Sequence, residues 1–133
     1  MVDIPKWHQF MRPLLLVLKE SGEMYRHDAI EAVVKKERLT DEQLAILQES
    51  NGKCVAKERI GWASSYLRVA GALVGPKRGY FALGPNSAQL LNLERAITKS
   101  DLKGIPEYQN HQAKKARTRA QGLEDSDSDD LED

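Results

Sequence analysis

Residues 57–80 read KERIGWASSYLRVAGALVGPKRGY, and they contain the main signals for the fold. At 100° per residue, its first half places four apolar residues on one helical face: Ile60, Ala63, Leu67 and Ala70. Gly71 follows as a residue suited to end that helix in a left-handed conformation. Two short apolar segments, 72–75 and 80–83, then flank Pro-Lys-Arg-Gly. The stretch therefore predicts a helix over 56–70 followed directly by a β-hairpin with a basic turn.

Further helices are expected upstream of this stretch. Apolar residues at helical spacing predict one over 4–20, bent or restarted at Pro13, and a second over 28–38. Thr40 opens T-D-E-Q, a capping box that predicts a third helix over 41–48. The short segment 23–26 could add an edge strand. Helices followed by a hairpin are the order of a winged helix-turn-helix, a mainly α fold with a small β-hairpin, whose last helix before the hairpin enters the DNA major groove.

Charge is divided unevenly along the chain. Residues 1–123 hold all 20 basic residues and 13 of the 20 acidic ones, a net charge of +7, and the other seven acids lie in 124–133. A last helix is expected over 87–98, and beyond it the sequence is polar. We therefore predict a winged-helix DNA-binding domain over 1–99 and a polar linker with an acidic disordered tail over 100–133. The tail is either a linker or solubility segment, or it folds back over the basic face and competes with DNA.

Composition argues against a membrane protein. The longest apolar run, Leu14 to Leu18, is five residues, far below the ~18 to 20 that span a bilayer. The N-terminus lacks the basic-then-apolar order of a signal peptide. The lone cysteine, Cys54, excludes an internal disulfide and a multi-cysteine zinc site. We expect a soluble, cytoplasmic protein that does not contact a membrane.

A polar surface accompanies the predicted helix and hairpin. The helix face opposite the apolar residues has no large apolar group, and the turn over 76–80 carries two adjacent cations. Basic side chains there could reach phosphates or guanine edges, and serine hydroxyls could contact either phosphate or base. The candidate DNA-binding residues are Lys57, Arg59, Gly61, Ser64, Ser65, Arg68, Lys77 and Arg78. The alternative interpretation of the same residues is a solvated polar face.

Gly61 lies in the interior of the predicted helix, where glycine costs roughly 1 kcal/mol relative to alanine. Two compensating reasons are open. The missing side chain lets the helix backbone approach a nucleic acid closely, or it lets another helix pack closely.

No catalytic or cofactor-binding pattern is found in the sequence. His8, His27 and His111 are dispersed and have no paired metal-ligand spacing, and Cys54 has no neighbouring histidine. Neither a Walker loop nor a G-x-G-x-x-G motif is present. We predict that the chain is not an enzyme and uses no metal or cofactor.

The pattern I-G-W-A-x-x-Y-L-x-x-A-G-x-L over 60–73, followed by P-x-R-G-Y-F-x-L over 76–83, resembles the N-terminal domain of the Mrr family of restriction endonucleases. Ile4-Pro5 and the segment MRPLL at 11–15 match the family's opening, so the resemblance covers about residues 3–92. It implies a winged-helix domain that binds DNA ahead of a separate nuclease domain, in systems that cut methylated foreign DNA. It also implies DNA contacts by residues 57–68 and by the Lys77-Arg78 turn.

The chain departs from the family pattern in two respects. Glu58-Arg59 stands where members often carry Asn-Arg, so a base preference is not transferred. The family's nuclease half looks like a PD-(D/E)xK-type fold, but Asp101-Leu102-Lys103 and Glu107-Tyr108 lie in polar, non-strand surroundings. We therefore expect any nuclease domain to lie elsewhere, in the same polypeptide or in a partner chain.

The leading hypothesis is that helix 56–70 and the wing at 76–80 bind double-stranded DNA, methylated or unmethylated. A protein-interaction winged helix is one alternative, because the charge of +7 is modest for a DNA-binding protein. A small transcriptional regulator is another. It would need a homodimer to read paired half-sites, for which apolar residues within 90–97 offer a face. The oligomeric state stays open.

Overall fold

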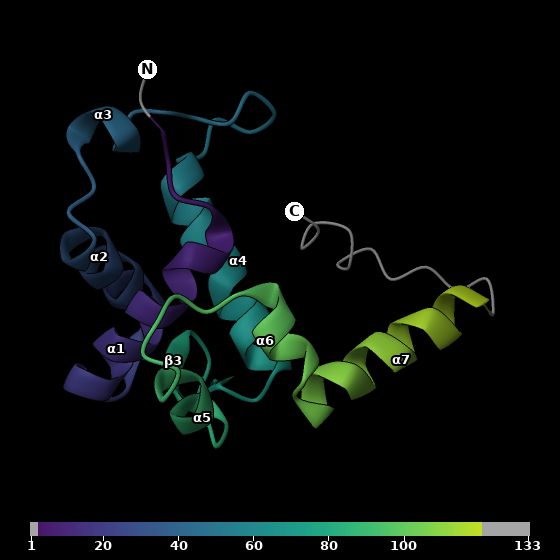
Figure 1. Ribbon diagram of the computed structural model, residues 1–133. Helices are drawn as coiled ribbons and strands as arrows, with labels where there is room; N and C mark the ends of the chain where they lie inside the picture. Colours follow the sequence, from purple (N-terminus) through teal and green to yellow (C-terminus); the bar gives the residue numbers. More distant parts are fainter. Residues whose placement is uncertain (1–2, 121–133) are drawn as a thin grey trace.

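The computed structural model describes residues 3–120 (Figure 1). Helices form most of it, and one small antiparallel sheet completes it, which confirms the mainly α fold with a small β component. The helices are η1 (Trp7–Phe10), α1 (Met11–Ser21), α2 (Arg26–Lys36), α3 (Asp41–Leu44), α4 (Val55–Val69), α5 (Ser87–Leu91), α6 (Lys99–Lys103) and α7 (Pro106–Ala120). The strands are β1 (Met24–Tyr25), β2 (Leu73–Val74) and β3 (Tyr80–Leu83).

The first α-helix begins later than its sequence pattern predicted. A single turn of 3-10 helix, η1, comes first, and α1 then starts at Met11. Pro13 lies in the first turn of α1, where its missing N–H is not needed and its fixed φ suits a helix. The proline therefore marks a restart, which was one of the two outcomes expected for it.

The sheet has the strand order β1-β3-β2, with both pairings antiparallel. Met24 pairs with Phe81 at one edge of β3, and Leu73 pairs with Leu83 at the other. The edge strand expected within 23–26 is therefore present as β1. The loop of residues 75–79, which joins β2 to β3, is called the wing below. Helices α2 and α4 followed by this hairpin are compatible with the predicted winged helix-turn-helix.

The segment between α2 and α4 is less helical than expected. Thr40 and Gln43 form the predicted capping box: the Gln43 N–H donates to Thr40 Oγ1 at 3.1 Å and the Thr40 N–H donates to Gln43 Oε1 at 2.8 Å. The helix over 41–48 was nevertheless predicted too long, because α3 ends at Leu44. No residue of α3 is fully buried, and Leu44, which packs against the core while partly exposed, is its last residue. The chain continues as a loop in which Leu47 bridges Cys54.

The core forms where α1 and η1 pack on α4. Its largest fully buried members come from these elements, from β2 and from the segments after the wing: Trp7, Phe10, Met11, Leu14, Leu15, Leu18, Ile60, Leu67, Leu73, Ile97, Leu102 and Tyr108. Trp7 stacks on Tyr66 with ring centroids 4.2 Å apart, and Tyr66 faces Tyr108 at 6.4 Å. This aromatic column joins η1, α4 and α7. Gly71, with φ 75°, follows the end of α4 as predicted.

The packed body continues past the boundary that was predicted after residue 99. The expected helix over 87–98 ends at Leu91, and α6 and α7 replace the expected polar linker. Three apolar residues beyond residue 99 are buried in the core, Leu102, Ile105 and Tyr108, as is Ile97 just before it. They are separated by polar residues, so they form no amphipathic pattern long enough to be recognised. The acidic segment 124–133 lies outside the described residues.

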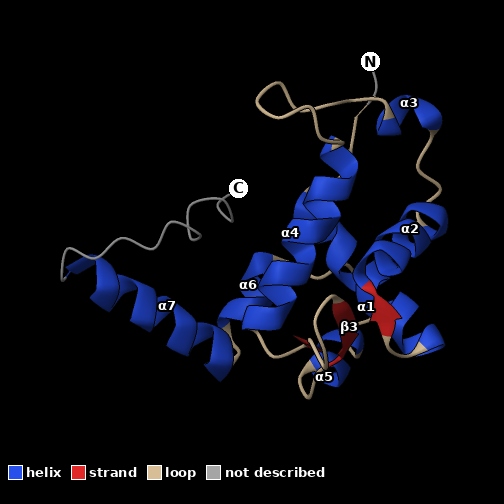
Figure 2. Cartoon of the chain, turned by 180° about the vertical axis from the view of Figure 1, so that it is seen from behind, coloured by secondary structure: helices blue, strands red, loops and turns tan. Residues whose placement is uncertain are grey.

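Helix α6 lies beside α4, and α7 extends from it away from the rest of the body (Figures 1 and 2). Within the described part of the chain, no helix has the length and apolar character needed to cross a membrane.

Replacing Leu102 by alanine tests whether α6 belongs to the core. Leu102 is fully buried, so we expect the free energy of unfolding to fall by about 3 kcal/mol, within the range of roughly 2–5 kcal/mol for such leucines. Urea denaturation of the full chain measures the change. Lys103→Ala, on an exposed neighbour in the same helix, is the control and should stay within about 0.5 kcal/mol of the wild type. Equal stability of both variants would mean that α6 contributes nothing to the core.

Asp101 should make the stability depend on pH in the acid range. Its carboxylate accepts hydrogen bonds from Arg95 at 2.8 and 2.9 Å and from the Thr98 N–H at 2.8 Å. Chiefly because of Arg95, the pKa of Asp101 is lowered to about 2, whereas an unfolded aspartate titrates near ~3.9. The stabilisation is therefore complete above about pH 4 and is lost as the pH falls toward 2.

We accordingly expect Asp101→Ala to be less stable than the wild type by on the order of 2 kcal/mol at neutral pH. The difference should shrink between pH 4 and pH 2. Urea denaturation of both proteins at pH 6, 4 and 3 measures it, and a difference that does not change with pH would contradict the assignment.

Candidate nucleic-acid interface

A hollow of about 340 Å³ lies between the wing, the start of α2 and the C-terminal half of α4. We call it the wing hollow. Its lining is Arg26, Arg68, Gly75, Lys77, Arg78, Gly79, Tyr80 and Phe81. Four of these residues are cations, and among the described residues no acidic side chain lines the hollow. The structure thus brings together three of the predicted site residues, Arg68, Lys77 and Arg78.

The conformation of the wing depends on Gly79. Its φ of 82° is a value that other residues rarely adopt, and a Cβ there would lie 3.1 Å from a ring carbon of Tyr25. Lys77 packs its ammonium 4.2 Å from the centre of the Tyr80 ring and pairs with Glu23 at 3.4 Å. Arg78 is exposed and has no ion pair with any described residue. The wing therefore presents one partly neutralised cation and one that no acid offsets.

A second hollow, of about 470 Å³, lies between the first halves of α2 and α4. We call it the helix hollow. Its lining is Arg26, His27, Ile30, Glu31, Lys53, Cys54, Lys57 and Glu58. Lys57 Nζ lies 2.7 Å from Glu31 Oε2, and the hydrogen bond raises the pKa of Lys57 above its usual value. The predicted residue Lys57 therefore stays protonated at neutral pH, but Glu31 offsets its charge.

Arg26 lines both hollows and so joins them into one surface, which we call the basic groove. Its side chain is exposed, and within the described residues it makes neither an ion pair nor a hydrogen bond. Sequence analysis missed Arg26, because the residue fell at the end of an expected edge strand. The sequence signal that could have identified Arg26 was its position as a cation between that strand and the following helix. Only the packing of α2 beside α4 and the wing reveals its position.

Ser64 and Gly61 do not lie on an open face, contrary to the prediction. Ser64 is 4% exposed, and its hydroxyl donates to the Gly61 carbonyl at 2.6 Å. The Ser65 hydroxyl donates to the same carbonyl at 3.3 Å. Hydroxyls can be satisfied in this way by the preceding turn of their own helix, so a polar residue in a helix need not face solvent. Gly61 is buried beneath the end of the Arg26 side chain.

The Arg59 side chain binds the N-terminal segment and does not line the basic groove. Its Nη1 donates to the carbonyls of Ile4 and Pro5 at 3.0 and 3.1 Å, which ties the N-terminal segment to α4. Neither Arg59 nor Ser65 lines the wing hollow or the helix hollow. Of the eight predicted residues, the groove lining therefore contains Lys57, Arg68, Lys77 and Arg78.

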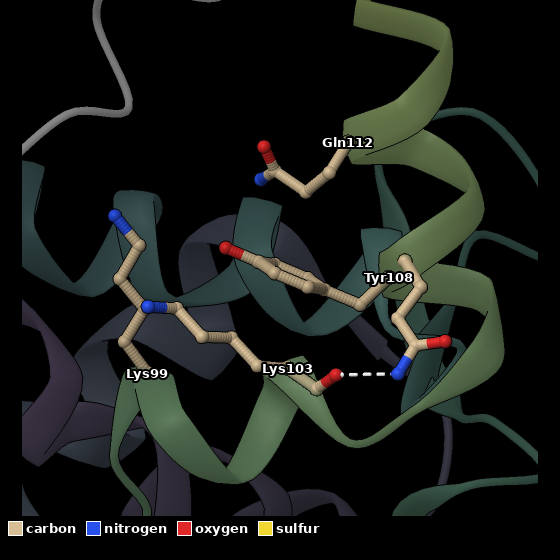
Figure 3. A pocket seen from close by; sticks show the side chains of 5 residues that line it. Lys99, Lys103, Tyr108 and Gln112 are labelled. Carbon is tan, nitrogen blue, oxygen red and sulfur yellow. Dashed lines mark hydrogen bonds between the residues drawn. The ribbon is translucent and has the colours of Figure 1, made fainter. Parts of the chain in front are cut away.

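A separate hollow of about 450 Å³ lies on α6 and α7 (Figure 3). It is lined by Lys99, Lys103, Tyr108, Gln109 and Gln112. All of these except Lys99 lie in the segment that was predicted to be a linker. Figure 3 shows the Tyr108 ring between Gln112 and the two lysines. The Gln109 amide donates to the Lys103 carbonyl at 2.8 Å. The Tyr108 hydroxyl is buried and has no hydrogen-bond partner among the described residues.

The chemistry that the basic groove offers is anion binding. A guanidinium group is planar and donates two parallel hydrogen bonds to a phosphate, whereas a lysine ammonium acts as a point charge. Across residues 3–120, no group of three or more His, Cys, Asp or Glu side chains lies close enough to hold a metal ion.

Comparison with protein-family models matched residues 7–93 to the family described as the Mrr N-terminal domain. The match covers well over half of the chain and runs from η1 through α5, so that it includes α4 and the wing. Comparisons with curated proteins and with solved structures found no match. The chain belongs to the Mrr N-terminal domain family.

Proposed function

We propose that this protein binds duplex DNA through the basic groove. The observation that carries the proposal is the wing hollow, where cations from α2, α4 and the wing meet with no acidic lining residue in the described part of the chain. Each basic side chain that neutralises a phosphate releases condensed counterions, which is the main source of affinity for DNA irrespective of sequence. Arginine, which supplies three of the four cations, suits phosphate geometry best.

Helix α4 occupies the position of a recognition helix, directly before the hairpin. Its 15 residues correspond to about 22 Å of helix, and the major groove is wide enough to admit an α-helix. With α4 in that groove, Arg68 and the wing cations Lys77 and Arg78 contact the adjoining phosphate backbone. These contacts position the domain on DNA, and they carry no base preference of their own.

Membership of the Mrr N-terminal domain family supports a place in a restriction system. In this proposal the chain is the DNA-recognition part, and cleavage belongs to a nuclease domain in the same polypeptide or in a partner chain. Membership of this family extends the proposal to duplexes whose bases are methylated. Titration of matched methylated and unmethylated duplexes at several salt concentrations tests whether methylated bases are recognised. Equal affinities at every salt concentration would show that they are not.

A second candidate function is binding of a protein partner. Two ion pairs, Lys57 with Glu31 and Lys77 with Glu23, leave the groove with mixed charge, which suits a polypeptide as well as a polyanion. Fluorescence anisotropy with a random duplex near 100 mM salt separates the two. Micromolar or tighter binding, weakening steeply with salt, is expected for DNA, and its absence would favour the protein partner.

The wing should contribute affinity for every DNA sequence alike. We expect Lys77→Ala combined with Arg78→Ala to weaken binding by roughly tenfold or more at 100 mM salt. Because two phosphate contacts are lost, the slope of log K against log salt should become shallower by about two. Arg68→Ala should lower affinity in the same way, with a slope change of about one.

The chain offers a matched control for the wing variant. Lys35 and Lys36 are adjacent cations on α2 that line neither hollow, and Lys36 pairs with Glu20 much as Lys77 pairs with Glu23. Alanine at both positions removes the same charge outside the groove and should change affinity less than about twofold. Equal losses for the two double variants would show that net charge matters and that the wing is not a contact.

A further inference from the structure

We propose that Arg26 is a phosphate-binding residue that joins the wing to α4, and that Gly61 is the residue that positions it. This inference rests on the proposed DNA binding, and it names the residue that binds a phosphate where the wing meets α4. It gives Gly61 a role different from either of the two considered from the sequence.

The backbone of Arg26 is fixed to the wing. Arg26 is the first residue of α2, and its N–H donates to the Gly79 carbonyl at 2.7 Å. The residue before it, Tyr25, pairs with Tyr80 in the sheet. The starting point of the Arg26 side chain is therefore set by the hairpin, although the residue belongs to a helix.

The far end of the same side chain lies over α4. A Cβ built on Gly61 would come within 3.2 Å of an Nη of Arg26. Apart from the chain neighbours and the backbone of α4 itself, this nitrogen is the one described atom within 4 Å of that position. The space that glycine leaves is thus filled by the tip of a guanidinium and not by the backbone of another helix. Gly61 forms a notch in α4, and Arg26 lies in it.

Electrostatics favour an anion beside Arg26 in the wing hollow, whereas Glu31 and Glu58 line the helix hollow, which Arg26 also lines. Arg26 places a cation at the N-terminus of an 11-residue helix, where the helix dipole is already positive. Three more cations, Arg68, Lys77 and Arg78, line the wing hollow. Asp28, in the same turn of α2, forms no ion pair with Arg26. A phosphodiester that passes from the wing to α4 would meet the guanidinium at the junction and relieve this repulsion through two charge-assisted hydrogen bonds.

A double-mutant cycle on the full chain tests the proposal, with anisotropy on a random duplex at 100 mM salt as the readout. Arg26→Ala should weaken binding about tenfold and make the salt slope shallower by about one. Gly61→Ala forces the guanidinium to shift by a few tenths of an ångström and should weaken binding about two- to threefold. Gly61→Leu fills the notch, so its loss of DNA affinity should approach the loss for Arg26→Ala. In the Arg26→Ala background, neither Gly61 substitution should change affinity further.

Thermal unfolding separates positioning from damage to the fold. Alanine is the better helix former, so Gly61→Ala should melt at the wild-type temperature or a few degrees above it, while its DNA affinity falls. Lys35→Ala controls for loss of one cation from α2. Gly104→Ala controls for a glycine substitution, because its φ is negative and a Cβ there meets its nearest neighbour at an ordinary 3.8 Å. Both controls should bind DNA as the wild type does.

Two results would overturn the inference while leaving DNA binding intact. If the Gly61 variants bind as tightly as the wild type, the notch does not position Arg26 for DNA. If they weaken binding by the same factor with and without Arg26, the nucleic acid approaches the α4 backbone directly and Arg26 is not the intermediary. A wild-type chain that fails to bind duplex DNA would instead defeat the proposed function itself.

Discussion

The pairing of β1 with β3 is the constraint on which the basic groove depends. Strand β1 has two residues, yet it runs without a break into α2, and the first N–H of that helix bonds to the wing at Gly79. The hairpin, whose Leu73 and Phe81 are buried in the core, is thereby also attached to the start of α2. Cations from residue 26, residue 68 and residues 77–78 meet in one hollow for this reason.

The cations of the groove fall into two kinds. Lys57 and Lys77 each lie beside a glutamate, and both pairs are largely exposed to solvent. Exposed ion pairs contribute only about 0–1 kcal/mol, so a phosphate can replace the carboxylate at little cost. The arginines, Arg26, Arg68 and Arg78, form no ion pair among the described residues. We infer that these three supply most of the attraction for an anion, and that the lysines add to it only once their acids have been displaced.

The C-terminal helices extend the domain beyond its family match. That match ends at residue 93, yet Leu102, Ile105 and Tyr108 are buried in the common core. Tyr108 completes an aromatic column that begins with Trp7 and passes through Tyr66 of α4. Because Tyr108 lies in the first turn of α7, its burial sets the direction in which that helix leaves the body (Figures 1 and 2). Aromatic rings thus link α4, the helix before the wing, to α7, which lies beyond the family match.

Local signals in the sequence were sufficient for the order of elements. Helical periodicity predicted α4, glycine after it predicted its end, the Thr40 capping box predicted the start of α3, and two apolar runs around a basic turn predicted the hairpin. Each of these depends on residues a few positions apart, so the amino-acid order contains the whole signal. The cations Arg68, Lys77 and Arg78 could be chosen for the same reason, since they lie on elements that were already recognised.

Tertiary structure alone decided which residues share a surface. Arg26 enters the groove because α2 packs beside α4, Gly61 is covered because that side chain reaches it, and Ser64 turns inward to its own helix. Leu102, Ile105 and Tyr108 are too sparse to mark a core element until they meet α4 and its neighbours. Sequence periodicity reports the average exposure of a helix face, whereas burial depends on contacts between segments distant in the chain. Those contacts are set by packing, and no local pattern specifies them.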